Sequence, residues 1–251
     1  MTPVSYYTPG EITSPKFAYA FARGCGGTIT DEPDLFPGPV ALFGTPSLWP
    51  VLRAARAQGR EWFYGDHGYF GRNTYFRVTW NAYQHDGRGD YAPGRFLTFH
   101  RDVKPWRTSG SHVLVCPNSE AYFRLHRMDR DRWLADVLAT LRQHTDRELR
   151  VRYKHTPLEI KYDLADAWAC VSFSSMAAVD ALIVGVPVFS LAPFASSARM
   201  GLSDLAQIES PIYPDDREPF VWALAANQWT LPEILRGVAW RSLQTTIEAA
   251  A

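Results

Sequence analysis

Short apolar runs alternate with helical patterns along most of the chain. In the first part, apolar runs that favour strands are followed by segments with helical periodicity, and Ser47 is placed to cap one of these helices. Strands that alternate with helices indicate parallel βαβ units. The strands predicted in this part are residues 4–7, 28–30, 40–43, 62–64 and 75–80.

The alternation restarts after a polar segment at residues 107–110. A buried strand, a long amphipathic helix and a second strand are predicted first, and a short helix follows them. The segment 169–190 then has the pattern of a buried strand, a Ser-Ser turn, a helix ended by glycine and another buried strand. We therefore predict an α/β protein with two Rossmann-like lobes, residues 1–109 and 110–251, whose parallel sheets face a central cleft.

Composition narrows the function classes. The 251 residues are 46% hydrophobic with a formal net charge of zero, which predicts a filled core and argues against a surface built wholly for nucleic acid. Residues 95–154 nevertheless carry 13 basic and 7 acidic side chains, so this part could face phosphate groups. Three widely spaced cysteines, no signal peptide and no apolar span predict a cytoplasmic protein.

Polar residues that follow the buried strands are the first candidates for a site, because ligands of open parallel sheets bind beyond the carboxyl ends of strands. Ser174 and Ser175 begin a helix, where hydroxyl and backbone N–H groups could bind phosphate. Ordinary helix capping explains the same two residues. Asp180, on the same helix, could accept from ribose hydroxyls or could simply be a helical acid.

Two further strand ends carry polar side chains. Lys154 and His155 follow a predicted strand, and the lysine could counter a diphosphate leaving group. Asn118 and Ser119 follow another, although a turn into a helix would also account for them. With Ser174 and Ser175, these residues make up the candidate donor site.

Asp66 and His67 are the candidate catalytic residues. They follow an apolar run and lie among Gly65, Gly68 and Gly71, which let a backbone approach a ligand closely. Either side chain could act as the general base that a sugar transfer needs, and we favour Asp66 slightly. A turn in which Asp66 caps its own loop is the alternative.

An aromatic cluster with basic residues follows. Tyr69, Arg72 and Tyr75 could bind an acceptor by stacking on a base or a sugar ring, although a hydrophobic cluster under a loop is the ordinary explanation. No set of residues has metal-ligand spacing, and neither a phosphate-binding P-loop nor a hydrolase G-x-S-x-G motif is present. We expect metal-independent chemistry without a cofactor.

The segments VRYKHTP and ADAWACVSFSSMAAVDALIVGVPVFS resemble the donor lobe of two-lobed (GT-B) glycosyltransferases of the capsule and teichoic-acid type. The resemblance covers about 40 residues. It implies that Ser174 and Ser175 contact the diphosphate of a nucleotide sugar, UDP-linked by expectation. It also implies that Asp180, where the family usually has Glu, contacts the ribose, and that the tail from Pro219 returns to the first lobe.

The segments WFYGDHGYFGRNTYFRVTWNAYQH and NQWTLPEILRGVAW are similar to those of small phage-encoded glycosyltransferases. This second resemblance implies a hexosyltransferase that modifies hydroxymethylated bases of double-stranded phage DNA in the host cytoplasm. A capsule or cell-surface glycan transferase, a nucleotide-sugar epimerase and a non-catalytic nucleotide or DNA binder stay open as alternatives. The sugar, the stereochemical outcome and the oligomeric state are not predicted.

Overall fold

A computed structural model describes residues 2–32 and 34–250. The chain forms two compact units, the first made of residues 1–85 and 225–251 and the second of residues 86–224. The division falls before the boundary at residue 109 that the sequence suggested. The intervening segment packs within the second unit, where the Lys104 N–H donates to the Ile183 carbonyl (2.8 Å) and the Arg107 N–H donates to the Gly185 carbonyl (2.7 Å).

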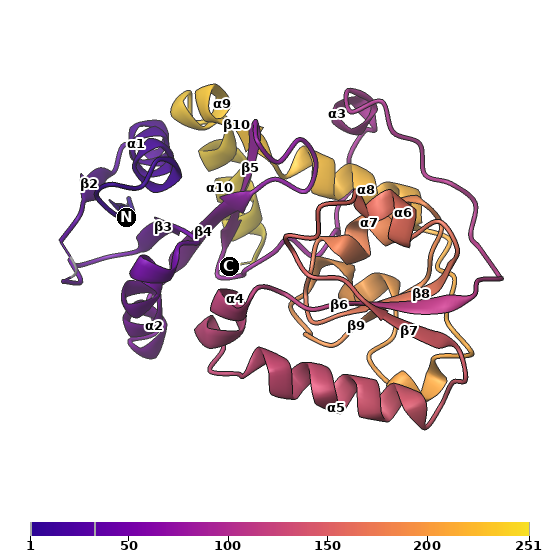
Figure 1. The fold of residues 1–251 in the computed structure, drawn as a ribbon. Helices are drawn as coiled ribbons and strands as arrows, with labels where there is room; N and C mark the ends of the chain where they lie inside the picture. The colour runs from indigo at the N-terminus through magenta and orange to yellow at the C-terminus, as the bar shows by residue number, and fades with distance from the viewer. Residues whose placement is uncertain (1, 33, 251) are drawn as a thin grey trace. The chain divides into compact units, whose positions relative to one another are not determined.

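The first unit is built on a six-stranded sheet in the order β10-β5-β4-β3-β1-β2 (Figure 1). Strands β1 to β4 are parallel, while β5 and β10 run antiparallel to their neighbours. The chain from residue 225 belongs to this unit and supplies β10 and two helices. The strands are β1 (Val4–Tyr6), β2 (Thr28–Thr30), β3 (Val40–Phe43), β4 (Trp62–His67), β5 (Tyr75–Trp80) and β10 (Trp229–Thr230).

Helices cover both faces of this sheet, with α1 and α2 on opposite sides of β3 and β4 in Figure 1. Helix α1 ends where Gly26 adopts a left-handed conformation (φ 71°), and α9 begins with a reciprocal capping box between Thr230 and Glu233. The core between them is aromatic and includes Phe17, Phe21 and Phe63. The helices are α1 (Thr13–Cys25), the 3-10 turn η1 (Pro46–Leu48), α2 (Trp49–Ala57), α9 (Leu231–Leu235) and α10 (Val238–Ala250).

The second unit is built on a four-stranded parallel sheet in the order β7-β6-β8-β9. Its two central strands, β6 and β8, are buried along their whole length, as strands covered by helices on both faces must be. Figure 1 shows α5 on one face and α7 on the other. The strands are β6 (His112–Cys116), β7 (Glu148–Val151), β8 (Ala167–Ser172) and β9 (Val188–Ser190).

Local sequence signals explain the helices of this unit. Asp129 caps α5 by accepting from the Arg132 N–H (2.7 Å), and Gly185 (φ 83°) ends the turn after α7. The remaining elements are α3 (Gly94–Leu97), α4 (Glu120–Leu125), α5 (Arg130–Arg142), α6 (Ile160–Asp163), α7 (Ala177–Ile183), η2 (Ser196–Met200), η3 (Leu205–Gln207) and α8 (Arg217–Ala226).

The two units repeat one parallel topology. Strands β2-β1-β3-β4 of the first unit have the same order and direction as β7-β6-β8-β9 of the second, so each unit starts at an inner strand, adds a neighbour on one side and then crosses to the other. The prediction of an α/β protein with two Rossmann-like lobes is confirmed. In the part of the chain that the structure describes, no helix has the length and apolar character needed to cross a bilayer.

Candidate functional site

The loops after β6 and β8 meet at the switch point of the second unit, where the strand order reverses and ligands of such sheets bind. Asn118 Oδ1 accepts from the Ser174 N–H (3.0 Å), and Asn118 Nδ2 donates to Ser174 Oγ (3.4 Å). The structure therefore brings together two predicted donor-site residues that lie 56 positions apart in the sequence. Ser174 is only 1% exposed, so this hydrogen-bonded pair lies at the buried base of the switch point.

The two other serines of the predicted donor site accept hydrogen bonds from nearby backbone N–H groups. Ser119 caps α4 by accepting from the Tyr122 N–H (3.3 Å), and Ser175 accepts from the Ala177 N–H (3.3 Å). Both are half-buried. The capping that was the ordinary explanation for them is present.

Lys154 and His155 follow β7, whose neighbour in the sheet is β6. Both side chains are exposed, and neither forms a hydrogen bond or ion pair with other described residues. They are free to reach a ligand at the carboxyl edge of this sheet.

Asp180 has an ion-pair partner that the sequence did not reveal. Its Oδ1 accepts from Arg101 Nη1 at 3.1 Å, and its side chain is 13% exposed. This pair ties the segment before β6 to α7, and it is a sufficient structural reason for an acid at this position. The ribose contact stays a prediction.

In the first unit, Asp66 and His67 are the last two residues of β4, which ends three positions beyond the strand end that the sequence predicted. Asp66 Oδ2 accepts from Arg77 Nη2 (2.6 Å), while its Oδ1 accepts from the His67 N–H (2.7 Å). Arg77 is 4% exposed, and its guanidinium lies over the Tyr69 ring and donates to the His67 carbonyl (2.7 Å). A buried guanidinium is costly unless it is paired with a carboxylate, and Asp66 is the partner of Arg77. This structural role argues against Asp66 as the general base.

The His67 ring is held in one tautomer. Its Nδ1 lies 2.8 Å from the Arg72 carbonyl, and a carbonyl oxygen can only accept, so Nδ1 carries the proton of the neutral ring. Its Nε2 is then an unprotonated nitrogen. The half-buried imidazole packs against the rings of Phe43 (centroids 5.4 Å apart) and Phe76 (5.8 Å).

The structure places the three predicted acceptor residues in different environments. Tyr69 is 1% exposed and accepts from the His85 N–H (2.7 Å) through its hydroxyl, so its ring belongs to the core and offers no face to a ligand. Arg72 is exposed, and Tyr75 is half-buried on β5. The expectation that Tyr69 stacks on an acceptor therefore does not fit its burial.

The sequence reasoning missed a second polar cluster in the first unit. Glu11, after β1, accepts from Thr45 Oγ1 (2.6 Å) and from Ser47 Oγ (3.4 Å), both after β3. Ser47 was expected to cap a helix, but no side-chain cap bond is present at η1 or α2. The rule that pointed to the other strand ends applies equally to these two loops, so the signal was present.

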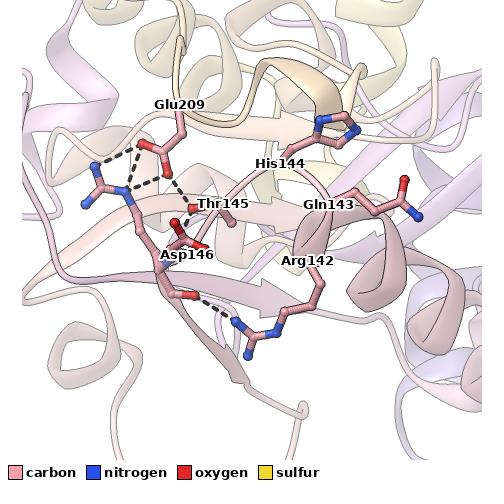
Figure 2. Close-up of a pocket in the computed structure, with 7 residues that line it drawn as sticks. Arg142, Gln143, His144, Thr145, Asp146 and Glu209 are labelled. Carbon is pink, nitrogen blue, oxygen red and sulfur yellow. Dashed lines mark hydrogen bonds and ion pairs between the residues drawn. The ribbon is translucent and has the colours of Figure 1, made fainter.

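A polar pocket opens elsewhere in the second unit, between the end of α5 and β7 (Figure 2). Arg147 forms an ion pair with Glu209 (Nη2–Oε2 3.0 Å), and Thr145 also donates to Glu209. Burial raises the pKa of Glu209, but the hydrogen bonds from Arg147 and Thr145 outweigh it and leave the pKa lowered. The segment 142–147 that lines the pocket precedes β7, so the pocket lies at the edge of the sheet opposite Asn118 and Ser174.

Among the described residues, no three His, Cys, Asp or Glu side chains gather where they could hold a metal ion. Cys116 and Cys170, far apart in the sequence, are neighbours on adjacent strands. Their hydrogen bond, together with burial, raises the pKa of the Cys170 thiol well above its ordinary value. This pair is inert core rather than a reactive centre.

No protein-family model matches the sequence, and no curated protein matches it. Solved structures do match. One is the beta Kdo 2,4 transferase of KpsC from Thermosulfurimonas dismutans (TM-score 0.51, 14% identity, covering 91% of this chain and 92% of that chain). Another is the beta Kdo 2,7 transferase of the same KpsC (TM-score 0.54, 12% identity, covering 96% and 100%).

This chain shares their fold. At 12–14% identity the likeness is one of architecture, and it extends over nearly the whole of each chain. The shared architecture agrees with the predicted α/β fold with two Rossmann-like lobes.

Proposed function

We propose that this protein is a glycosyltransferase that moves a sugar from a nucleotide-activated donor to a hydroxyl group of a glycan. The observation that carries the proposal is the fold likeness, over nearly the full chain, to two transferases that act on Kdo. Polar residues at the carboxyl edge of each parallel sheet support it, because this is where such folds bind substrates.

The second unit would hold the donor. Asn118 and Ser174 form the floor of its switch point, and the half-buried Ser175 is positioned to donate a hydrogen bond to a phosphate oxygen. Lys154 and His155 extend from the neighbouring strand end without other partners among the described residues, so a cation is available to neutralise the departing phosphate.

His67 would be the general base, and Asp66 would position it. The Arg72 carbonyl fixes the proton on Nδ1, so Nε2 can accept a proton from the incoming hydroxyl. Asp66 accepts from the His67 N–H and pairs with Arg77, which fixes the end of β4. This assignment reverses the order of preference that the sequence alone suggested.

The acceptor is the least constrained part of the proposal. A glycan acceptor is consistent with the names of the two similar structures, which are both Kdo transferases, whereas no feature of the described residues supports a hydroxymethylated DNA base. A UDP-linked donor, metal-independent turnover and a cytoplasmic location stay predictions.

The test is an assay of purified protein with a panel of donors, namely nucleotide-linked Kdo, UDP-glucose, UDP-galactose and their N-acetyl forms. Each donor is supplied with methyl glycosides or with hydroxymethylated duplex DNA, with and without EDTA, and release of the nucleotide and mass gain of the acceptor are both measured. We expect one donor to support transfer to a glycoside, and Ser175→Ala to raise the KM for that donor.

Three outcomes would contradict the proposal. Transfer to DNA alone would overturn the glycan acceptor but keep the transferase. Conversion of the donor sugar to an isomer without transfer would indicate an epimerase. Neither hydrolysis nor transfer with any donor would leave a binding protein.

A further inference from the structure

The first unit has a switch point of its own, and sequence reasoning assigned no residue to it. The chain passes from β1 to β2 on one side and then crosses to β3 on the other side of β1. The loops after β1 and β3 therefore diverge at the carboxyl edge, which is the place where open parallel sheets bind ligands. The corresponding place in the second unit is occupied by Asn118 and Ser174.

Hydroxyl groups and one carboxylate fill this switch point. Thr45, which is 6% exposed, donates to Glu11 Oε1 (2.6 Å), and Ser47 lies within hydrogen-bond distance of both Glu11 Oε1 (3.4 Å) and Thr8 Oγ1 (2.6 Å). Thr8 and Glu11 come from the loop after β1, while Thr45 and Ser47 come from the loop after β3. We call these four residues the β1–β3 cluster.

The carboxylate of this cluster is both fixed and accessible. Glu11 is exposed, and its bonds from Thr45 and Ser47 go to Oε1, while Oε2 accepts no hydrogen bond from other described residues. A carboxylate oxygen held in place at the protein surface can accept from a hydroxyl without first losing side-chain freedom.

The chemistry of the cluster suits a polyhydroxylated ligand. A carboxylate accepts from sugar hydroxyls, and serine and threonine hydroxyls both donate and accept. A nucleic-acid backbone is a poor fit, because the Glu11 carboxylate would repel phosphodiester groups that lie close to it.

We propose that the β1–β3 cluster binds the hydroxyl groups of a glycan acceptor, with Glu11 as the principal hydrogen-bond acceptor. This inference rests on the proposed function and names the acceptor side of the same reaction. His67 ends β4, the strand next to β3, so the cluster and the proposed base share one edge of one sheet.

The decisive variant is Glu11→Gln, which keeps the Oε1 that Thr45 and Ser47 contact and replaces only the second carboxylate oxygen by an amide. We expect it to raise the acceptor KM at least about tenfold, the effect of losing a charge-assisted hydrogen bond. The kcat at saturating acceptor and the rate of donor hydrolysis without acceptor are expected to stay within about threefold of wild type.

The matched control is Glu61→Gln, which makes the same chemical change at an exposed position directly before β4, at the opposite edge of the sheet, and keeps the Oε1 that accepts from Trp80 Nε1. Glu61→Gln is expected to leave the acceptor KM unchanged. Thermal unfolding of both variants separates binding from folding, and we expect both to match wild type. An acceptor KM in Glu11→Gln within about threefold of wild type would overturn the inference.

Failure of the proposed function is recognised separately, because the wild-type protein would then turn over none of the donors. Binding can still be measured in that case by saturation-transfer NMR with methyl hexosides and methyl hexosaminides. Wild-type binding that weakens in Glu11→Gln and in Thr45→Val would sustain the site without the reaction. Equal binding by wild type and both variants, or no binding by any of them, would overturn it.

Discussion

The two units have one strand order but different side chains at their switch points. In the second unit, Asn118 bridges to the backbone of Ser174, and the bridge is largely buried. In the first unit, Glu11 bridges to the side chains of Thr45 and Ser47, and its carboxylate is exposed. The repeated topology thus gives two switch points, and the side chains at each decide which ligand chemistry it could support.

The units also differ in what they offer for proton transfer. The first places His67 at the end of β4 with a fixed tautomer and an available Nε2. The second has an exposed lysine and an exposed histidine on the loop after β7, groups suited to an anion. In the proposed function, this difference favours the first unit for the base and the second for the phosphate.

Replacement of His67 tests that assignment most strongly. His67→Gln removes the basic nitrogen at a similar side-chain volume, and we expect kcat to fall about 10²- to 10⁴-fold, the usual contribution of a general base. The control is His144→Gln, an exposed position at the opposite edge of the second unit's sheet, which is expected to be neutral. A kcat for His67→Gln close to wild type would remove the base from the first unit.

Two glycines with left-handed backbones provide the next largest effect, on stability. A Cβ at Gly185 (φ 83°) would lie 2.0 Å from the Pro105 carbonyl oxygen, whereas a Cβ at Gly59 (φ 66°) would meet no atom within 4 Å. We expect Gly185→Ala to lower the free energy of unfolding by about 2–4 kcal/mol and Gly59→Ala by about 1 kcal/mol. Urea titration followed by circular dichroism measures both.

Equal losses for Gly185→Ala and Gly59→Ala would contradict the close packing of residues 101–107 against α7. That packing is what places the segment before β6 in the second unit. The pair of variants therefore also tests the division of the chain at residue 85.

Asn118 separates structure from binding in the second unit. Asn118→Ala leaves the buried Ser174 N–H without its acceptor, and we expect a loss of about 1–2 kcal/mol of unfolding free energy. Asn118→Asp keeps an acceptor oxygen, so its stability is expected to be near wild type. The added charge repels a phosphate, and the donor KM is expected to rise about tenfold.

The corresponding change in the first unit is Thr45→Val. It removes a donor from an exposed carboxylate that water can solvate, so we expect a loss below about 1 kcal/mol. A loss as large as that of Asn118→Ala would mean that both bridges are structural, and the contrast between the units would fail.

The smallest expected effect concerns the pH dependence of the Arg147–Glu209 pair. Because the pKa of Glu209 is lowered on folding, its contribution to stability is present above the ordinary carboxyl pKa and is lost as pH falls through the lowered value. We expect Glu209→Gln to cost at most about 1 kcal/mol at pH 7, since the pair is partly exposed. The difference from wild type should shrink as pH falls below the ordinary carboxyl pKa and vanish once Glu209 is protonated in the folded protein; a constant difference would contradict it.

Much of the fold could be predicted from the chain. The strands 28–30, 40–43 and 75–80 were predicted with the bounds that the structure has, because short apolar runs between turn residues have few other solutions. The predicted strand 62–64 extends to His67, since Gly65 and Asp66 pair with β5 despite their poor strand propensity.

The location of the candidate site could be predicted, but the contacts among its side chains could not. Because ligands bind beyond the carboxyl ends of parallel strands, Asn118 and Ser174 could both be predicted as site residues. The partners of Asp66 and Asp180 could not be predicted, because Arg77 and Arg101 lie 11 and 79 residues away in the sequence. The burial of Tyr69 was equally hidden, since an aromatic residue in a loop has no periodicity that would assign it to the core.

By itself the sequence determined which segments become strands and helices, and hence which polar residues come to lie at strand ends. These depend on local patterns of apolar residues, glycines and caps, which act over a few positions. The tertiary structure alone decided that Asp66 pairs with Arg77, that Nε2 of His67 is the available nitrogen and that Glu11 meets Thr45. Such contacts depend on sheet order and register, which arise only when distant segments pack together.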